Sequence, residues 1–235
     1  KIGQFLPMRD LPSPVSLNRE AVGIVTNLYW LMFDKLVAYS FNRPVGRIAY
    51  NWQQSRNYWI FDLFEGVTFH NGEVCNAEDV EYSYQKWMEQ NEDNNPIVNL
   101  QVIDACTFLL ELERDYSFSD LPMPFIVPRG TTNEVGLVGT GPFVAAEIEP
   151  DYWRLSAYKG YHCDKPFFDE VTVRRYQSPE ELKEALRDGE VDMAVGVDVD
   201  DEHFDVQTDR GDCPSVPPFY NECPVSHVKN LRALE

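Results

Sequence analysis

A strand, a tight turn and a capped helix follow one another between residues 58 and 87, and their order constrains the fold more than any other feature. Residues 58–63 are rich in aromatic and β-branched types, which favour strands. The pair Asn71-Gly72 is the strongest short signal for a turn between two strands. Asn76 is a preferred N-cap, and acidic residues in the next turn suit a helix N-terminus. We therefore expect a mixed α/β structure.

Hydrophobic patterns and turn residues predict further elements along the chain. Strands are expected at residues 2–8, 67–69, 100–103, 108–112, 152–158, 171–176 and 191–195. A helix is expected over about residues 19–37, and a turn at residues 43–46. Ser178 and Glu181 resemble a capping box that starts a helix, and Gly189 ends it. Together with its flanking strands, this helix predicts a βαβ unit.

The chain is strongly acidic, with 39 Asp and Glu against 20 Lys and Arg and a net charge of −19. Such a charge repels the phosphates of nucleic acids and anionic membrane surfaces, so direct nucleic-acid contact is not expected. No apolar run is long enough to span a bilayer, and no signal peptide is evident. Because Lys1 already lies in a predicted strand, we expect an excised piece of a larger protein.

Cysteine and histidine usage favours neither a disulfide framework nor a metal site. The five cysteines are an odd number, which favours free thiols in a reducing compartment. Cys213 and Cys223 nevertheless lie close enough in sequence to pair across a short loop. The four histidines show no metal-binding spacing, so no metal is expected.

Motifs for catalysis and cofactor binding are not found. The turn at residues 139–141 has the sequence Gly-Thr-Gly but lacks both the Walker A and the dinucleotide-binding pattern, so it is interpreted as structural. The acidic residues at 198, 200 and 201 lack the spacing of a calcium-binding loop. No serine or cysteine stands in a recognisable nucleophile context. We expect no catalytic residue and no cofactor, and interpret the chain as a non-enzyme.

Ordered motifs over nearly the whole chain resemble the signature of the family 5 extracellular solute-binding proteins, which include oligopeptide, dipeptide and nickel-binding proteins. The motifs are Trp52-Gln53-Gln54-Ser55, Gly66-Val67-Thr68-Phe69-His70-Asn71-Gly72, Asn76-Ala77-Glu78-Asp79-Val80, Val138-Gly139-Thr140-Gly141-Pro142-Phe143, Asp169-Glu170-Val171 and Gly189-Glu190-Val191-Asp192-Met193-Ala194. Three positions depart from the family pattern, which usually has Arg at Phe64, Asp at Asn71 and Gly at Cys163.

The resemblance implies one lobe of a two-lobe ligand trap with the periplasmic-binding-protein-like type II fold. This fold is α/β (mixed α+β), with a mixed sheet and an inserted α+β subdomain. Residues 1–24 and 137–235 would form the core of lobe I, and residues 25–136 the inserted subdomain. The second lobe would lie outside this chain. A small molecule or peptide would bind between the lobes.

A narrower resemblance concerns residues 6–12 and 17–20, which are similar to the start of the ligand domain in SgrR-type transcriptional regulators. These cytoplasmic proteins join a winged-helix DNA-binding domain to a family 5 domain. The resemblance favours a small-molecule-sensing domain of that type. The alternative is the substrate-binding component of an ABC transporter for oligopeptides, dipeptides or nickel, in the periplasm or at the cell surface, with an ABC permease as partner.

Two short segments supply the candidate ligand contacts. They are Pro12, Ser13, Pro14 and Val15 in one segment, and Trp87 and Met88 in the other. In the family, the loop after the first strand faces the cleft, so the backbone of the first segment would pair with an extended ligand. An ordinary connecting loop is the alternative there, and core packing is the alternative for Trp87. Ligand identity and oligomeric state stay open.

Overall fold

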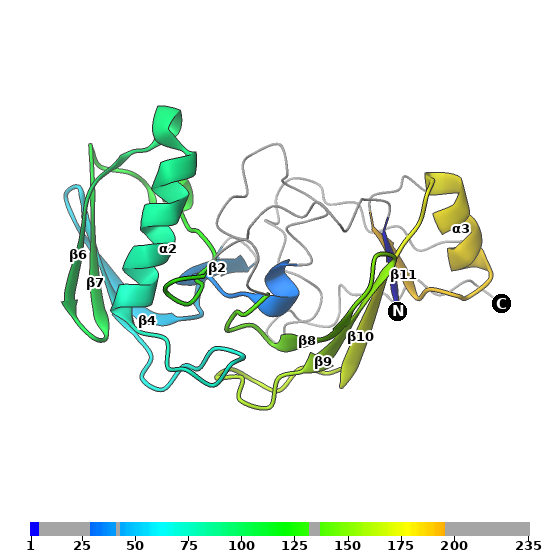
Figure 1. The fold of residues 1–235 in the computed structure, drawn as a ribbon. Helices are drawn as coiled ribbons and strands as arrows, with labels where there is room; N and C mark the ends of the chain where they lie inside the picture. The colour runs from blue at the N-terminus through cyan, green and yellow to red at the C-terminus, as the bar shows by residue number, and fades with distance from the viewer. Residues whose placement is uncertain (5–28, 41–42, 132–136, 196–235) are drawn as a thin grey trace.

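The structure is a computed structural model that describes residues 1–4, 29–40, 43–131 and 137–195. Its α-helices and strands, in chain order, are β1 (Ile2–Gln4), β2 (Val37–Ser40), β3 (Arg43–Gly46), β4 (Ala49–Ser55), β5 (Tyr58–Leu63), α2 (Ala77–Gln90), β6 (Ile97–Asp104), β7 (Thr107–Leu112), β8 (Phe143–Ile148), β9 (Tyr152–Ala157), β10 (Glu170–Arg175), α3 (Pro179–Arg187) and β11 (Met193–Val195). Figure 1 shows α2 with β4 to β7 at one end of the molecule, and α3 with β8 to β11 at the other. The mixed α/β class predicted from the sequence is confirmed.

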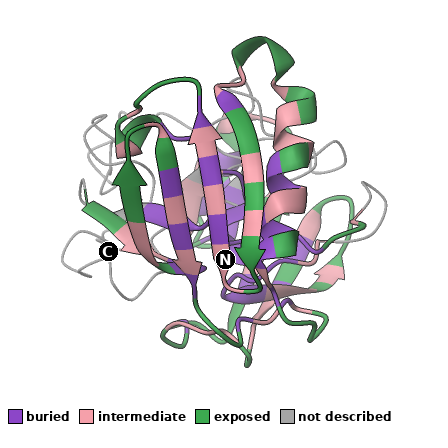
Figure 2. Ribbon diagram, turned by 90° about the vertical axis from the view of Figure 1, so that its left-hand side faces the viewer, coloured by how far each residue is buried: buried purple, intermediate pink, exposed green. Residues whose placement is uncertain are grey.

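The four-stranded sheet at the first end is antiparallel, with the order β4-β5-β7-β6. Buried and partly exposed residues alternate along the central strands β5 and β7, whereas the edge strands are more exposed (Figure 2). This period of two is expected for a sheet with one face on a core. Helix α2 covers the buried face (Figure 1).

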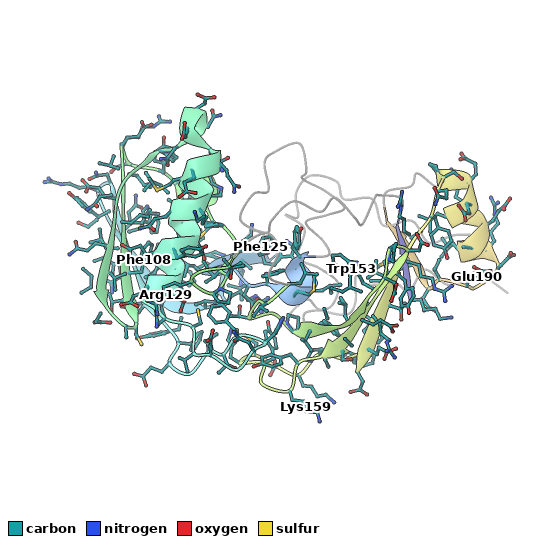
Figure 3. All side chains as sticks on the ribbon, in the orientation of Figure 1. Phe108, Phe125, Arg129, Trp153, Lys159 and Glu190 are labelled. Atoms are coloured by element: carbon teal, nitrogen blue, oxygen red, sulfur yellow. The ribbon has the colours of Figure 1, made fainter. Side chains whose placement is uncertain are left out.

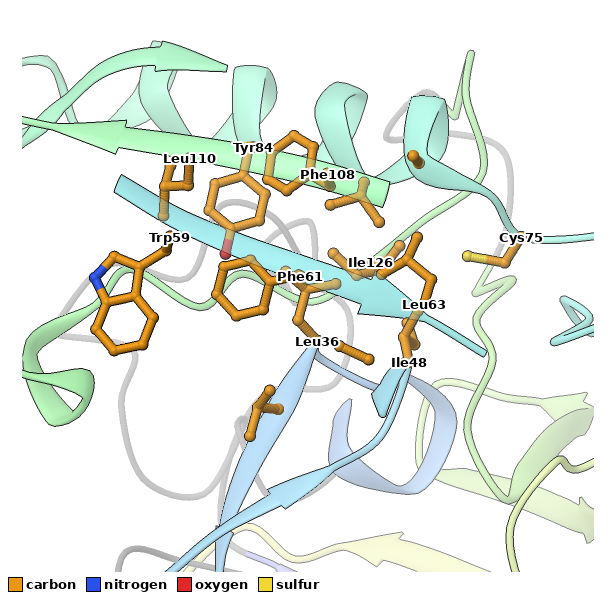
Figure 4. Packing of buried hydrophobic residues seen from close by; sticks show 14 of the residues in the cluster. Leu36, Ile48, Trp59, Phe61, Leu63, Cys75, Tyr84, Phe108, Leu110 and Ile126 are labelled. Atoms are coloured by element: carbon orange, nitrogen blue, oxygen red, sulfur yellow. The ribbon is translucent and has the colours of Figure 1, made fainter. Parts of the chain in front are cut away.

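The core between α2 and this sheet is built largely from aromatic and branched side chains (Figure 4). Phe108 on β7 lies opposite Phe61 on β5, and both side chains are fully buried. Tyr84 of α2 completes the layer, with its ring centroid 5.3 Å from that of Phe108. The Tyr84 hydroxyl donates to the Pro122 carbonyl at 3.0 Å, so its polar atom is satisfied within the core.

The N-terminus of α2 has the cap that the sequence predicts. The Asn76 side chain accepts a hydrogen bond from the Glu78 backbone N–H at 2.9 Å. The Asp79 carboxylate in turn accepts from the Asn76 backbone N–H at 3.0 Å, which completes a capping box. Asp79 also accepts hydrogen bonds from the backbone N–H and from the side chain of Arg129. These bonds connect the start of α2 to the chain at residue 129.

The five-stranded sheet at the other end has the order β11-β1-β10-β9-β8. Strand β1 runs parallel to both β10 and β11, whereas β8, β9 and β10 pair antiparallel. Helix α3 connects β10 to β11, with Leu182 and Leu186 buried against the sheet. The βαβ unit predicted from the sequence is therefore confirmed. Its helix starts at Ser178, whose hydroxyl accepts from the Glu181 N–H at 3.1 Å.

Two expectations over the first fifty residues are wrong. The predicted helix does not reach residue 37: in its described part only residues 29–32 are helical, and β2 begins at Val37. Residues 43–46 are strand β3, paired antiparallel with β2, and not an isolated turn. Strand β4 was not predicted at all. Each of these strands depends on pairing with a neighbour, which hydrophobic periodicity does not reveal.

None of the helices in the described ranges combines the length and apolar character needed to cross a membrane.

Candidate functional site

Three chain segments meet between the four-stranded and the five-stranded sheet: residues 29–36, residues 121–128 and residues 139–142. Figure 3 places Phe125 in this junction, between the half that carries Phe108 and the half that carries Trp153. The ring of Phe125 makes edge contacts with Tyr29 at 6.1 Å and with Trp30 at 5.2 Å. We call these three segments the junction. Its backbone hydrogen bonds and aromatic contacts connect the two ends of the structure.

Close backbone packing explains the glycines at residues 139 and 141. The Gly141 N–H donates to the Met32 carbonyl at 3.0 Å. A Cβ atom added at Gly141 would lie 2.4 Å from the Met32 carbonyl carbon, and one at Gly139 would lie 2.1 Å from the Met32 carbonyl oxygen. Only glycine allows this approach, and the turn leads directly into β8. The structural interpretation of the turn, rather than a phosphate loop, is in accord with this packing.

The His70 ring forms hydrogen bonds with the backbone of the same turn. The Gly139 N–H donates to Nδ1 at 3.3 Å, which leaves Nε2 to donate to the Gly141 carbonyl at 3.0 Å. Both ring nitrogens are therefore engaged when the ring is neutral. Burial, the largest influence, lowers the pKa of His70 below its ordinary value. His70 is thus a structural clamp between the Asn71-Gly72 turn and the junction.

We expect His70→Gln to lower the free energy of unfolding by about 1–2 kcal/mol at pH 7.5, because two hydrogen bonds are weakened. In the folded state the His70 ring stays neutral to lower pH, whereas in the unfolded state it binds a proton near pH 6.5. Below about pH 6.5 this proton binding favours the unfolded state, so the free energy of unfolding of the wild type falls. The difference in the free energy of unfolding between wild type and variant should therefore become smaller as the pH is lowered from 7.5 to 5. Urea unfolding of both proteins across this range measures it, and parallel pH profiles would contradict the clamp.

Buried and half-buried polar groups gather around Thr140 in the Gly139–Gly141 turn. Thr140 donates to the fully buried Asp34 at 3.4 Å, and His162 Nε2 lies 2.8 Å from the Arg47 carbonyl oxygen. Burial alone would lower the pKa of His162, but a hydrogen bond with Cys163 and the charge of Asp34 outweigh it and raise the pKa. These contacts join the segment at residues 139–142 to Asp34, and Arg47 to His162.

The predicted ligand contacts fall in two places. Residues 12–15 lie outside the described residues. Trp87 and Met88 lie near the end of α2, both half-buried against the core of the four-stranded sheet. The Trp87 carbonyl also accepts from the Asn91 side chain at 2.7 Å, which helps to end the helix. Their packing matches the core alternative for Trp87, and a role in ligand contact stays a prediction.

A shallow depression of about 320 Å³ opens beside the His70 turn. It is lined by His70, Asn71, Leu137, Val138, Val144, Ala145 and Ile148. The lining is mostly apolar, and His70 already uses both ring nitrogens on the junction backbone. In the described ranges, no three His, Cys, Asp or Glu side chains come close enough to hold a metal ion.

Residues 43–218 match the model of the bacterial extracellular solute-binding proteins, family 5. The chain belongs to family 5. The match begins at β3 and includes the four-stranded sheet, the Asn71-Gly72 turn, α2, the glycine turn of the junction and β8 to β11 of the five-stranded sheet. Members of the family are non-catalytic binding proteins. The family resemblance seen in the sequence motifs is confirmed.

Curated relatives of this family 5 chain share modest identity. A Bacillus subtilis protein of uncharacterised function, YhjP, is 27% identical over 152 residues, which is 60% of this chain and 26% of YhjP. The nickel-binding periplasmic protein of Escherichia coli is 22% identical over 188 residues, 71% of this chain and 36% of that protein. The chain thus spans only about a quarter to a third of the length of these relatives.

Solved structures share the fold at low identity. NikZ from Campylobacter jejuni, in complex with Ni(L-His), gives a TM-score of 0.71 at 18% identity, over 87% of this chain and 46% of NikZ. NikA from Brucella suis gives 0.69 at 22% identity, over 82% of this chain and 43% of NikA. AppA from Bacillus subtilis, in complex with a nonapeptide, gives a TM-score of 0.67 at 16% identity, over 81% of this chain and 42% of AppA. These likenesses establish the periplasmic-binding-protein-like fold of this chain.

Proposed function

We propose that this chain is lobe I of a two-lobe receptor that binds a solute and delivers it to an ABC permease. The observation that carries the proposal is the family 5 match over residues 43–218. Because the chain spans less than half of its solved neighbours, a second lobe in the same protein would complete the cleft. Solute binding would favour the closed arrangement of the lobes through tighter binding to that state.

Within lobe I, we retain residues 1–24 and 137–235 as the core and residues 25–136 as the inserted subdomain. The junction would then join the two subdomains. Its glycine packing and the His70 clamp support this division because both tie the turn at residues 139–141 to segments from the other half. The solute would meet the lobe on the side where the second lobe closes.

Transport is favoured over transcriptional regulation. The sequence favoured a regulator of the SgrR type on a short N-terminal resemblance, which lies outside the described residues. The relatives with named functions include a nickel-binding periplasmic protein, further nickel-binding proteins and an oligopeptide-binding protein, beside two proteins in complex with mannopinic acid and agropinic acid. Peptides and nickel complexes with small organic ligands are therefore the substrate classes we propose, without chemical conversion of the bound solute.

A location outside the cytoplasm accords with these relatives, and the buried thiol of Cys75 does not oppose it. Cys75, Cys106 and Cys163 are unpaired in the structure. Cys75 is buried, and burial raises the pKa of its thiol well above the ordinary value, so little reactive thiolate forms. An unreactive thiol survives in an oxidising compartment, so the preference for a reducing compartment drawn from cysteine number loses weight. The pair Cys213 and Cys223 lies outside the described residues.

Calorimetry of the full-length protein tests the proposal with a pool of short peptides and with nickel–histidine. We expect one of them to bind with a dissociation constant of about 1 μM or tighter, and residues 1–235 alone to bind at least about 100-fold more weakly, because half of the cleft is absent. Equal affinity of the isolated lobe and the full-length protein would contradict a two-lobe trap. Binding of neither probe to the full-length protein would contradict the proposed substrate classes.

A further inference from the structure

Lys35 carries a positive charge in the aromatic part of the junction. Its Nζ lies 4.9 Å from the ring centroid of Trp30 and 4.8 Å from that of Phe125. The two rings meet edge to face, with centroids 5.2 Å apart, and both are buried in the core that joins the junction to the five-stranded sheet. The ammonium therefore contacts two fixed aromatic walls.

The backbone around Lys35 is held in place. The Lys35 carbonyl accepts from the Ile48 N–H at 3.3 Å, and the Asp34 carbonyl accepts from the Ile126 N–H at 2.9 Å. Phe125, next to Ile126, lies between the two halves of the lobe (Figure 3). Lys35 is thus fixed at its backbone, and its half-buried side chain stands at the place where the two halves meet.

No carboxylate neutralises Lys35 within the part of the chain that the structure describes, where every ion pair involves other residues. The adjacent acid, Asp34, accepts a hydrogen bond from Thr140, and its charge raises the pKa of His162. The two buried rings shield the Lys35 ammonium from part of its water, and this burial lowers the pKa of Lys35 to about 8. A poorly hydrated cation beside aromatic rings costs free energy, and an incoming anion would recover it.

We propose that the Lys35 ammonium, flanked by Trp30 and Phe125, binds a carboxylate of the solute. This inference rests on the proposed function and narrows its substrate class to anionic organic solutes. Apolar walls with one well-placed charged group are the usual composition of a solute site. A peptide would present its C-terminal carboxylate, and nickel would arrive as a complex with a carboxylate-bearing ligand. The free Ni²⁺ ion would be repelled by Lys35.

Matched pairs of probes test this proposal on the full-length protein. One pair is a pool of short peptides with free carboxylates and the same pool with C-terminal amides. The other is nickel with histidine and nickel with histidinamide. In the wild type we expect the carboxylate member of at least one pair to bind about tenfold or more tightly than its amide, as a charge-assisted hydrogen bond allows.

The variants separate the charge of Lys35 from its packing. Lys35→Met should bring the carboxylate-to-amide affinity ratio to about one, whereas Lys35→Arg should keep a ratio above one. Lys86→Met is the matched control, because Lys86 is half-exposed like Lys35 but pairs with a carboxylate, Glu89, at 2.8 Å, and it should leave the ratio unchanged. Urea unfolding verifies that each variant is folded. If Lys35→Met does not fold, Lys35→Gln takes its place, because it also removes the charge.

The outcomes distinguish this inference from the proposed function. If the wild type binds a probe but Lys35→Met shows the same carboxylate-to-amide affinity ratio, the solute carboxylate does not bind Lys35. The inference then fails, whereas the proposed function stands. If the wild type binds carboxylate and amide equally, the inference fails in the same way. If none of the four probes binds the wild type, both the inference and the proposed substrate classes are contradicted.

Discussion

Phe108→Ala should lower the free energy of unfolding by about 3–5 kcal/mol, the largest effect we expect from a single core change. Phe108 is fully buried between α2 and the four-stranded sheet, in ring contact with Tyr84 and opposite Phe61. Removing its ring opens a cavity that the neighbouring side chains on α2, β5 and β6 cannot fill without moving. Urea unfolding followed by tryptophan fluorescence measures the loss.

Ile103→Ala is the matched control for this change. Ile103 lies on β6 of the same sheet and is 51% exposed, so its truncation removes little buried surface. We expect a loss below about 1 kcal/mol. Similar losses for both variants would show that Phe108 does not hold the core as the structure indicates.

Asp79→Ala should lower the free energy of unfolding by about 3 kcal/mol, because it removes three hydrogen bonds to one buried carboxylate. Asp79 accepts from the Asn76 N–H at 3.0 Å, from the Arg129 N–H at 3.1 Å and from Arg129 Nε at 3.3 Å. The change leaves two backbone N–H groups without an acceptor and weakens the cap of α2. Urea unfolding at pH 7.5 and helix content by circular dichroism measure it.

Glu78→Ala provides the comparison, because Glu78 precedes Asp79 on the same helical turn and pairs with the same Arg129. Its side chain is exposed, and an exposed ion pair contributes below about 1 kcal/mol. An equal loss from Glu78→Ala and Asp79→Ala would mean that burial of the Asp79 carboxylate does not matter. The structure predicts a clear difference.

The elements predicted correctly from the sequence are those with local causes. Helix α2 starts at Asn76 and α3 at Ser178 because a cap residue satisfies backbone N–H groups within three residues. Strands β5 and β7 carry their own alternation of buried residues. In contrast, β2 and β3 form only by pairing with each other, so Val37 was assigned to a helix and residues 43–46 to a turn.

The junction was harder to predict than the elements that meet there. The glycines at 139 and 141 were identified as a turn, but their contact with Met32 joins positions more than a hundred residues apart. The bonds of His70 to this turn are equally remote in sequence. The sequence shows Lys35 beside Asp34 within an otherwise apolar stretch from Tyr29 to Val37, yet only the structure places Phe125 against Lys35.

Native mass spectrometry of the full-length protein tests the central claim most directly, because it reports both binding and the fate of the solute. After incubation with the peptide pool and with nickel–histidine, we expect one solute molecule per protein, released on activation with its mass unchanged. A non-catalytic trap requires both results. A protein that holds no solute from either probe, or that releases a hydrolysed or otherwise altered product, would contradict the assignment of this lobe to a solute-binding receptor.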